Sequence, residues 1–277
     1  MPALEVVLAV LRWGGVALAL PPSVVYVRDF VGEPGPERAW KTRFLWGAIG
    51  LMSIALLLRA IQLRTVPLVS SLEALYFYAW LLLAVFLLLV GSRAHRALGA
   101  LLVPLAAVLA IAASAFMEPA GEVNSIFRNR LFAFHTLSEF LGYSALSVAF
   151  CAGVLYLLLF DEISHKKVGK MFARLPSLDD LDRLGHHTVL LGFILLTLGI
   201  VSGMVWARRE WGVFWVWEAK TVWTLLSWML YLGYLLARRL AGWQGARAAW
   251  LATLGFASTI FSFLGANYLL GPGRHVF

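Results

Sequence analysis

Residues 187–206 read HTVLLGFILLTLGIVSGMVW, a stretch without a single Asp, Glu, Lys or Arg. A helix of about 20 apolar residues is long enough to cross the hydrocarbon layer of a membrane. Seven further apolar stretches cover residues 3–27, 43–62, 72–91, 97–117, 131–160, 221–240 and 248–270. We therefore predict about eight transmembrane helices.

The overall composition leads to the same fold class. Hydrophobic residues make up 61% of the 277-residue chain and charged residues 14%, whereas a soluble domain is about half apolar and a quarter charged. Because lipid offers the backbone no hydrogen bonds, and these stretches are too continuous for barrel strands, they are predicted to be helices. We expect an all-α, polytopic membrane helix bundle that forms a single integral membrane domain over residues 1–277.

The positive charges predict how this bundle is oriented. With eight spans, both termini lie on one side, and the connections on the opposite side hold fourteen Lys and Arg residues against eight. Lys and Arg accumulate in cytoplasmic loops, so we predict that both termini are external, in a cell (plasma) inner membrane. The net charge of +8 is thereby attributed to the loops, and we expect the lipid bilayer, not nucleic acid, as the partner.

A tryptophan-rich stretch, WGVFWVWEAKTVW at residues 211–223, falls in one of the predicted external connections. His135, near the start of the fifth span, and His275, near the C-terminus, are predicted on the same face. Two imidazoles can ligate a haem iron from opposite sides, and aromatic rings pack well on a flat macrocycle. Arginines expected on this face could pair with the haem propionates, and they are Arg128, Arg130, Arg208, Arg209 and Arg274.

Simpler interpretations stay open at this point. Tryptophan is enriched where a membrane meets water, and a histidine near a helix end is more often a packing or surface residue than a ligand. Glu218 could favour the start of the following helix through the helix dipole. Glu139 shares a helical face with His135 and could orient its imidazole or face a water-filled rim.

Several motifs together resemble the CcsA/ResC family of haem-handling membrane proteins. Residues 211–256 are similar to that family's tryptophan-rich "WWD" region, whose core within the segment 206–228 is WEAKT here. VPLVSSLEALYFYAW (66–80), LPSLDDLDRL (175–184), LGFILLTLGIVSGMVWA (191–207) and LGANYLLGPGRHVF (264–277) resemble further family motifs. The resemblance covers the chain from residue 66 onward.

This resemblance implies a subunit of the System II cytochrome c maturation machinery. Such proteins present haem (haem b) at the external membrane face for thioether attachment to the CXXCH cysteines of apocytochrome c, together with a CcsB/ResB partner. Carried over to this sequence, the axial ligands of the haem iron would be His135 and His275. The aromatic surface would be Trp211, Trp215, Trp217 and Trp223, with Glu218 at the position of the family's Asp. The resemblance implies a subunit of a cytochrome c synthase with no independent catalytic side chain.

Two departures from the family pattern are visible. The core WDPKE reads WEAKT, and a histidine of the following helix is replaced by Leu236, which leaves the route of haem across the membrane open. The alternative is a HemX/YpjD-like regulator of haem metabolism without enzymatic activity, although such proteins generally lack so complete a tryptophan-rich stretch. A transporter is a third possibility, but these spans contain few of the polar midplane residues that transporters use.

Overall fold

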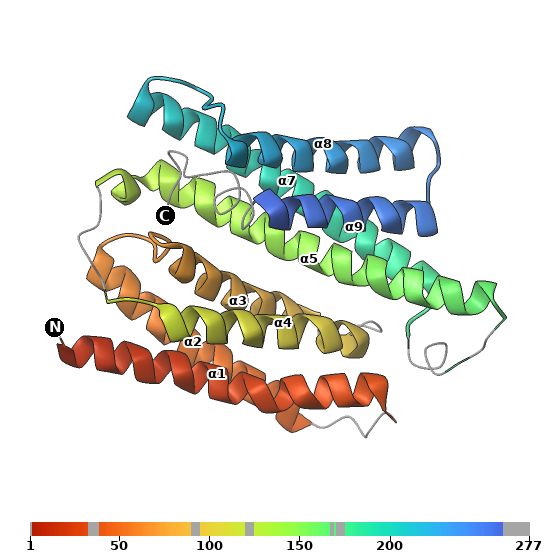
Figure 1. The fold of residues 1–277 in the computed structure, drawn as a ribbon, viewed down its shortest axis with the longest axis horizontal. Helices are drawn as coiled ribbons and strands as arrows, with labels where there is room; N and C mark the ends of the chain where they lie inside the picture. Colours follow the sequence, from red (N-terminus) through yellow and green to blue (C-terminus); the bar gives the residue numbers. More distant parts are fainter. Residues whose placement is uncertain are drawn as a thin grey trace. The chain divides into compact units, whose positions relative to one another are not determined.

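The computed structural model describes residues 2–32, 39–89, 95–119, 125–166, 169 and 175–262. Within them the chain forms eight α-helices and one short 3-10 helix, with no strand. The elements are α1 (Pro2–Val31), α2 (Ala39–Leu63), α3 (Ser71–Leu88), α4 (His95–Phe116), η1 (Ser125–Arg128), α5 (Arg130–Ser164), α7 (Leu178–Trp211), α8 (Ala219–Leu240) and α9 (Ala246–Ile260). Each coincides with one predicted span, apart from η1 (Figure 1).

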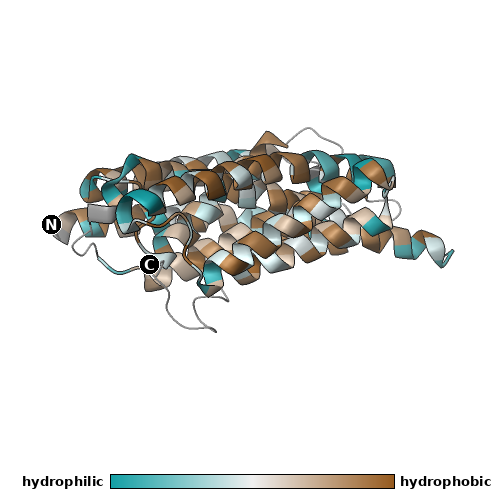
Figure 2. Ribbon diagram, turned by 90° about the horizontal axis from the view of Figure 1, so that it is seen from above, coloured by the Kyte–Doolittle hydropathy of each residue, from teal (hydrophilic) through white to brown (hydrophobic). Residues whose placement is uncertain are grey.

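The all-helical, polytopic membrane fold is confirmed. Six described helices are long and apolar enough to cross a membrane, and these are α1, α2, α3, α4, α5 and α7. Along the helices, hydrophobic residues predominate, and hydrophilic residues gather towards several helix ends (Figure 2). That α8 and α9 also span the membrane, and that both termini are external, remain predictions.

The chain divides into two compact units, residues 1–133 and residues 134–277. In the first unit α1 packs on α2 and α4, while α3 packs on the same two helices, so the four helices form a closed bundle. In the second unit α7, α8 and α9 contact one another, and α5 approaches α7 and α9 at glycines. The single domain expected over the whole chain stays a prediction.

A buried cluster of charged groups lies at one end of the first bundle. Arg59 of α2 is 6% exposed, and its Nε donates a hydrogen bond of 2.7 Å to Oε1 of Glu73, which is 2% exposed. Nη1 of Arg59 donates to Glu5 at 3.3 Å and to Gln62 at 3.1 Å. The second carboxylate oxygen of Glu73 accepts the backbone N–H of Val69 at 3.0 Å. Both charges are therefore satisfied within the unit, as buried charges require.

Glycines allow α5 and α7 to pack closely in the second unit. A Cβ added at Gly192 of α7 would lie 2.6 Å from the side chain of Leu146 and 3.2 Å from the carbonyl oxygen of Gly142, both on α5. Small residues at such contacts let membrane helices approach closely. Gly199 follows Gly192 after seven residues and Gly203 after eleven, so they continue this face towards the external end predicted for α7.

Candidate functional site: a pocket beside His135

The imidazole of His135 is held by a backbone group of α7. Its Nδ1 lies 2.8 Å from the carbonyl oxygen of Gly199. A carbonyl oxygen can only accept, so Nδ1 carries the proton in the neutral ring and Nε2 keeps its lone pair. The ring also lies nearly parallel to the indole of Trp206, with centroids 6.2 Å apart and 16° between the planes. This arrangement presents Nε2 as a metal ligand, because the other nitrogen is committed.

Two glycines make room for this arrangement. A Cβ on Gly203 would lie 2.8 Å from the His135 ring, and a Cβ on Gly199 would lie 2.6 Å from Cγ of Glu139. Both distances are too short for carbon atoms, so any side chain at these positions would displace its neighbour. The sequence GIVSG at residues 199–203 thus admits the two polar side chains of α5 against the backbone of α7.

Glu139 lies one turn after His135, as the four-residue spacing predicts. Its Oε2 is 3.8 Å from Nε2 of His135, which is beyond hydrogen-bonding distance. The group that orients the imidazole is therefore the carbonyl of Gly199 and not this carboxylate. Glu139 instead lines the pocket next to the histidine.

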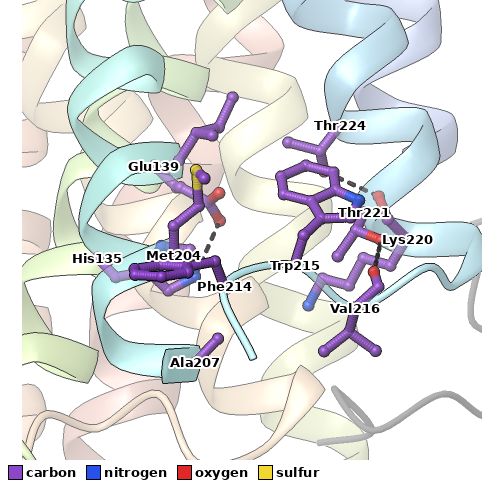
Figure 3. A pocket seen from close by; sticks show the side chains of 12 residues that line it. His135, Glu139, Met204, Ala207, Phe214, Trp215, Val216, Lys220, Thr221 and Thr224 are labelled. Atoms are coloured by element: carbon purple, nitrogen blue, oxygen red, sulfur yellow. Dashed lines mark hydrogen bonds and ion pairs between the residues drawn. The ribbon is translucent and has the colours of Figure 1, made fainter. Parts of the chain in front are cut away.

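A pocket opens between α5, α7, α8 and the loop that joins α7 to α8 (Figure 3). It contains about 520 Å³ of space, part of which is open to the outside. Its polar lining consists of His135, Glu139, Lys220, Thr221 and Thr224, and its apolar lining includes Met204, Phe214 and Trp215.

The loop over the pocket is fixed at its beginning. α7 ends at Trp211, and the C-cap residue Gly212 has a φ of +76°, a left-handed conformation that favours glycine. Arg208 donates a hydrogen bond to the carbonyl oxygen of Gly212, and its guanidinium lies 5.4 Å from the ring centroid of Phe214. The loop therefore starts in a defined direction, with Phe214 and Trp215 against the pocket.

The end of the loop is fixed by a capping box at the start of α8. Glu218 is the N-cap residue, and its backbone N–H donates to the hydroxyl of Thr221 at 3.2 Å. The same hydroxyl donates to the carbonyl oxygen of Val216. Reciprocal bonds of this kind satisfy the free N–H groups of a helix start. Glu218 thus caps the helix, as the sequence allowed, and it is not among the residues that line the pocket.

Lys220 lies in the first turn of α8, directly before the predicted span 221–240, and its side chain extends towards the pocket (Figure 3). It is half-buried. Burial lowers the pKa of its amino group, while the carboxylates of Glu139 and Glu218 act in the opposite direction. A cation is thus placed on the α8 wall of the pocket, across from the α5 wall that carries His135.

The four tryptophans predicted to form one aromatic surface lie in different surroundings. Trp215 lines the pocket, and its buried indole N–H has no hydrogen-bond partner in the part of the chain that the structure describes. Trp217 is 77% exposed and meets the edge of Trp215, with centroids 6.0 Å apart. Trp211 packs on Trp206 at 4.9 Å, and Trp223 packs on Phe261 at 4.4 Å. Of the four, only Trp215 lines this pocket.

The other predicted site residues are spread more widely. Arg128 and Arg130 belong to the unit of residues 1–133, and both are exposed. Arg208 holds the loop through Gly212 and Phe214. His275, the second predicted iron ligand, and Arg274 lie outside the described residues. The structure therefore brings together His135 and Trp215 from the predicted set.

Sequence reasoning did not single out Lys220, Met204, Gly199 or Gly203 as site residues. A signal for Lys220 was available, because a lysine two residues after an acidic N-cap is disfavoured by the helix dipole, so its position calls for another explanation. The glycines were visible as GIVSG, but the side chains that they contact lie sixty or more residues earlier, on another helix. For Met204 the sequence carried no signal beyond an apolar residue in an apolar run.

Comparison with known proteins identifies the family. Residues 68–272 match the family described as Cytochrome C assembly protein. This match covers most of the chain. The chain belongs to the cytochrome c assembly protein family. Its role therefore lies in cytochrome c biogenesis, and it is a multi-pass membrane protein of this family.

Individual relatives agree with this assignment. The cytochrome c biogenesis protein CcsA of Chlamydomonas reinhardtii is 32% identical over 243 residues, which cover 84% of this chain and 67% of that protein. CcsA of Guillardia theta is 31% identical over 81% of this chain and 80% of its own length. CcsA of Prochlorococcus marinus (strain MIT 9215) is 48% identical over 97 residues, or 35% of this chain and 31% of that protein.

A solved structure has a similar fold. It is described as the Cytochrome c Heme Lyase CcmF, and it aligns with a TM-score of 0.58 at 19% identity. The alignment covers 92% of this chain but 46% of that longer chain. At this identity the comparison establishes a common helical fold. The family match and the CcsA relatives together confirm the resemblance to the CcsA/ResC family that the sequence motifs indicated.

Proposed function

We propose that this chain binds haem and presents it for attachment to apocytochrome c, as a membrane subunit of a System II cytochrome c synthase. The observation that supports this most directly is the state of His135. Its Nδ1 is committed to the carbonyl of Gly199, which leaves Nε2 as a ligand atom beside a pocket of about 520 Å³. A fixed imidazole in a largely apolar cavity suits a haem iron.

The described residues fit haem in three respects. His135 supplies a nitrogen ligand, Phe214 and Trp215 supply aromatic contact, and Lys220 supplies a positive charge. Zinc fits less well, because it usually takes three or four protein ligands. No group of three His, Cys, Asp or Glu residues suited to a metal occurs within the described ranges. We propose His275 as the second iron ligand, on the resemblance stated above.

In this proposal the chain's residues bind and orient haem, and they do not perform proton transfer. Attachment adds each substrate thiol across a haem vinyl group, so that the S–H bond is exchanged for a C–S and a C–H bond. No side chain of the pocket has to act as an acid or a base in that addition. The protein orients the haem edge, and a CcsB/ResB-like partner and the apocytochrome complete the reaction at the external face.

The test is the absorption spectrum of the purified, detergent-solubilised protein. The wild type is expected to show the Soret and α/β bands of six-coordinate haem, and His135→Ala is expected to lose them. The matched control is His165→Ala, because His165 directly follows the same helix and is exposed. In a His135→Gly variant, added imidazole should restore the bands if the lost group was a ligand. A His135→Ala, His275→Ala double variant that kept the wild-type spectrum would refute the ligand assignment.

The external position of the site can be checked in cells. Val213 lies in the loop over the pocket and Ala241 in the connection after α8, and both are exposed. A membrane-impermeant maleimide should label Val213→Cys and not Ala241→Cys in intact cells, while the native Cys151 is buried. The reverse pattern would contradict the proposed orientation. A haem-free preparation, together with normal cytochrome c levels in a deletion strain, would favour the HemX/YpjD-like regulator.

A further inference from the structure

The two walls of the pocket carry opposite charges. His135 and Glu139 project from α5, and Lys220 projects from the start of α8 on the other side (Figure 3). Thr221 and Thr224 continue the α8 wall, whereas Gly203 and Met204 of α7 lie with the α5 side chains. A ligand in this pocket therefore meets a carboxylate and an imidazole on one side and an ammonium group on the other.

The position of Lys220 is unfavourable for the helix that bears it. The first turn of a helix carries partial positive charge, which stabilises acidic residues and disfavours lysine. The stability of the α8 start is supplied instead by Glu218 and Thr221. Lys220 is also half-buried, so its charge is partly removed from water. A ligand carboxylate that approaches this ammonium group forms a charge-assisted hydrogen bond with it.

Haem has a matching asymmetry. Its iron lies at the centre of the macrocycle, and its two propionate carboxylates lie together on one edge. On the basis of the proposed function, we infer that Lys220 pairs with a propionate of haem while the iron faces His135. The carboxylate of Glu139 beside His135 disfavours the reversed orientation, because it would repel propionates on that side.

Three of the arginines considered for propionate binding are less well placed than Lys220. Arg208 is bound to the carbonyl of Gly212 and packs on Phe214, which fixes the loop. Arg128 and Arg130 belong to the other compact unit. Among the residues that line the pocket, Lys220 is the cation.

The experiment compares haem with haem dimethyl ester, in which both carboxylates are neutral. Each ligand is titrated into the purified full-length protein, and the dissociation constants are taken from the Soret band. A hydrogen bond to a charged group corresponds to a preference of about tenfold or more, so wild type should bind haem at least that much more tightly than the ester. In Lys220→Gln the ratio of the two dissociation constants should fall to nearly one, and Lys220→Arg should keep most of the preference for haem.

Two controls keep the outcome interpretable. Lys166→Gln removes an exposed lysine elsewhere and should leave the preference unchanged. Glu139→Gln removes the opposing carboxylate and should strengthen haem binding with little effect on the ester. Both ligands are measured on the same variant. A partly unfolded preparation therefore lowers the apparent affinities for haem and for the ester alike, and the ratio of the two affinities does not change.

The possible outcomes separate this inference from the proposal on which it rests. If wild type binds both ligands equally through His135, or Lys220→Gln keeps the wild-type preference, the propionate assignment is refuted and haem binding stands. If wild type binds neither ligand, the proposed function fails and the inference fails with it.

Discussion

Two sets of charged groups in this membrane protein have different surroundings. One is Arg59 with Glu73 in residues 1–133, and the other is Glu139 with Lys220 in residues 134–277. The guanidinium of Arg59 and the carboxylate of Glu73 are almost fully buried and bonded directly to each other. Glu139 and Lys220 line a pocket that opens to the outside. The first arrangement is closed, whereas the second lies beside a space that a ligand can enter. Charge in a membrane helix therefore indicates a binding site only when its surroundings leave it accessible.

The largest expected effect tests the closed arrangement. Glu73→Gln replaces the buried carboxylate bonded to Nε of Arg59 with a neutral amide and leaves the more distant Glu5 as the charged partner of Arg59. Breaking a buried ion pair costs about 3 kcal/mol or more. The thermal unfolding midpoint in detergent should fall strongly, while the haem spectrum per folded molecule should not change. The matched control is Asp179→Asn, which breaks an ion pair with Arg183 whose side chains are both 67% exposed, and it should leave the midpoint unchanged. An unaltered midpoint in Glu73→Gln would show that the cluster does not stabilise the fold.

A smaller effect tests the open arrangement. Gly203→Ala places a methyl group 2.8 Å from the His135 ring and should push the imidazole away from its position. Overpacking of this kind costs about 1 to 3 kcal/mol, so haem titration should show binding weakened by about tenfold. Gly233→Ala is the control, since a Cβ at Gly233 meets nothing within 4 Å. If both alanine variants bound haem like wild type, the ring would not depend on the close approach of α7.

The smallest effect concerns a pocket residue that serves the fold. Thr221→Ala removes the hydroxyl that accepts the Glu218 N–H and donates to Val216, and the loss of a helix cap costs about 1 kcal/mol. The unfolding midpoint should fall slightly, and the preference for haem over its dimethyl ester should persist. Thr221→Ser, which keeps the hydroxyl, should behave like wild type. A lost preference in Thr221→Ala with an unchanged midpoint would mean that this hydroxyl binds ligand.

Local patterns in the sequence predicted much of what the structure contains. Eight helices follow from eight apolar stretches, because each helix satisfies its own backbone hydrogen bonds regardless of its neighbours. The shared face of His135 and Glu139 follows from their spacing of four residues. A helix start close to Glu218 agrees with the expectation that its charge favours the positive end of the helix dipole. These are properties of consecutive residues, so the sequence suffices for them.

Tertiary structure alone decided how the site is assembled. The acceptor that orients His135 is the carbonyl of Gly199, 64 residues away, and no local pattern connects the two. The tryptophans of residues 211–223 were expected to share one surface, but their directions depend on the left-handed Gly212 and on separate contacts with Trp206 and Phe261. Lys220 faces the pocket because α8 starts beside α5 and α7. Such contacts join distant segments, and they are fixed only when the helices pack.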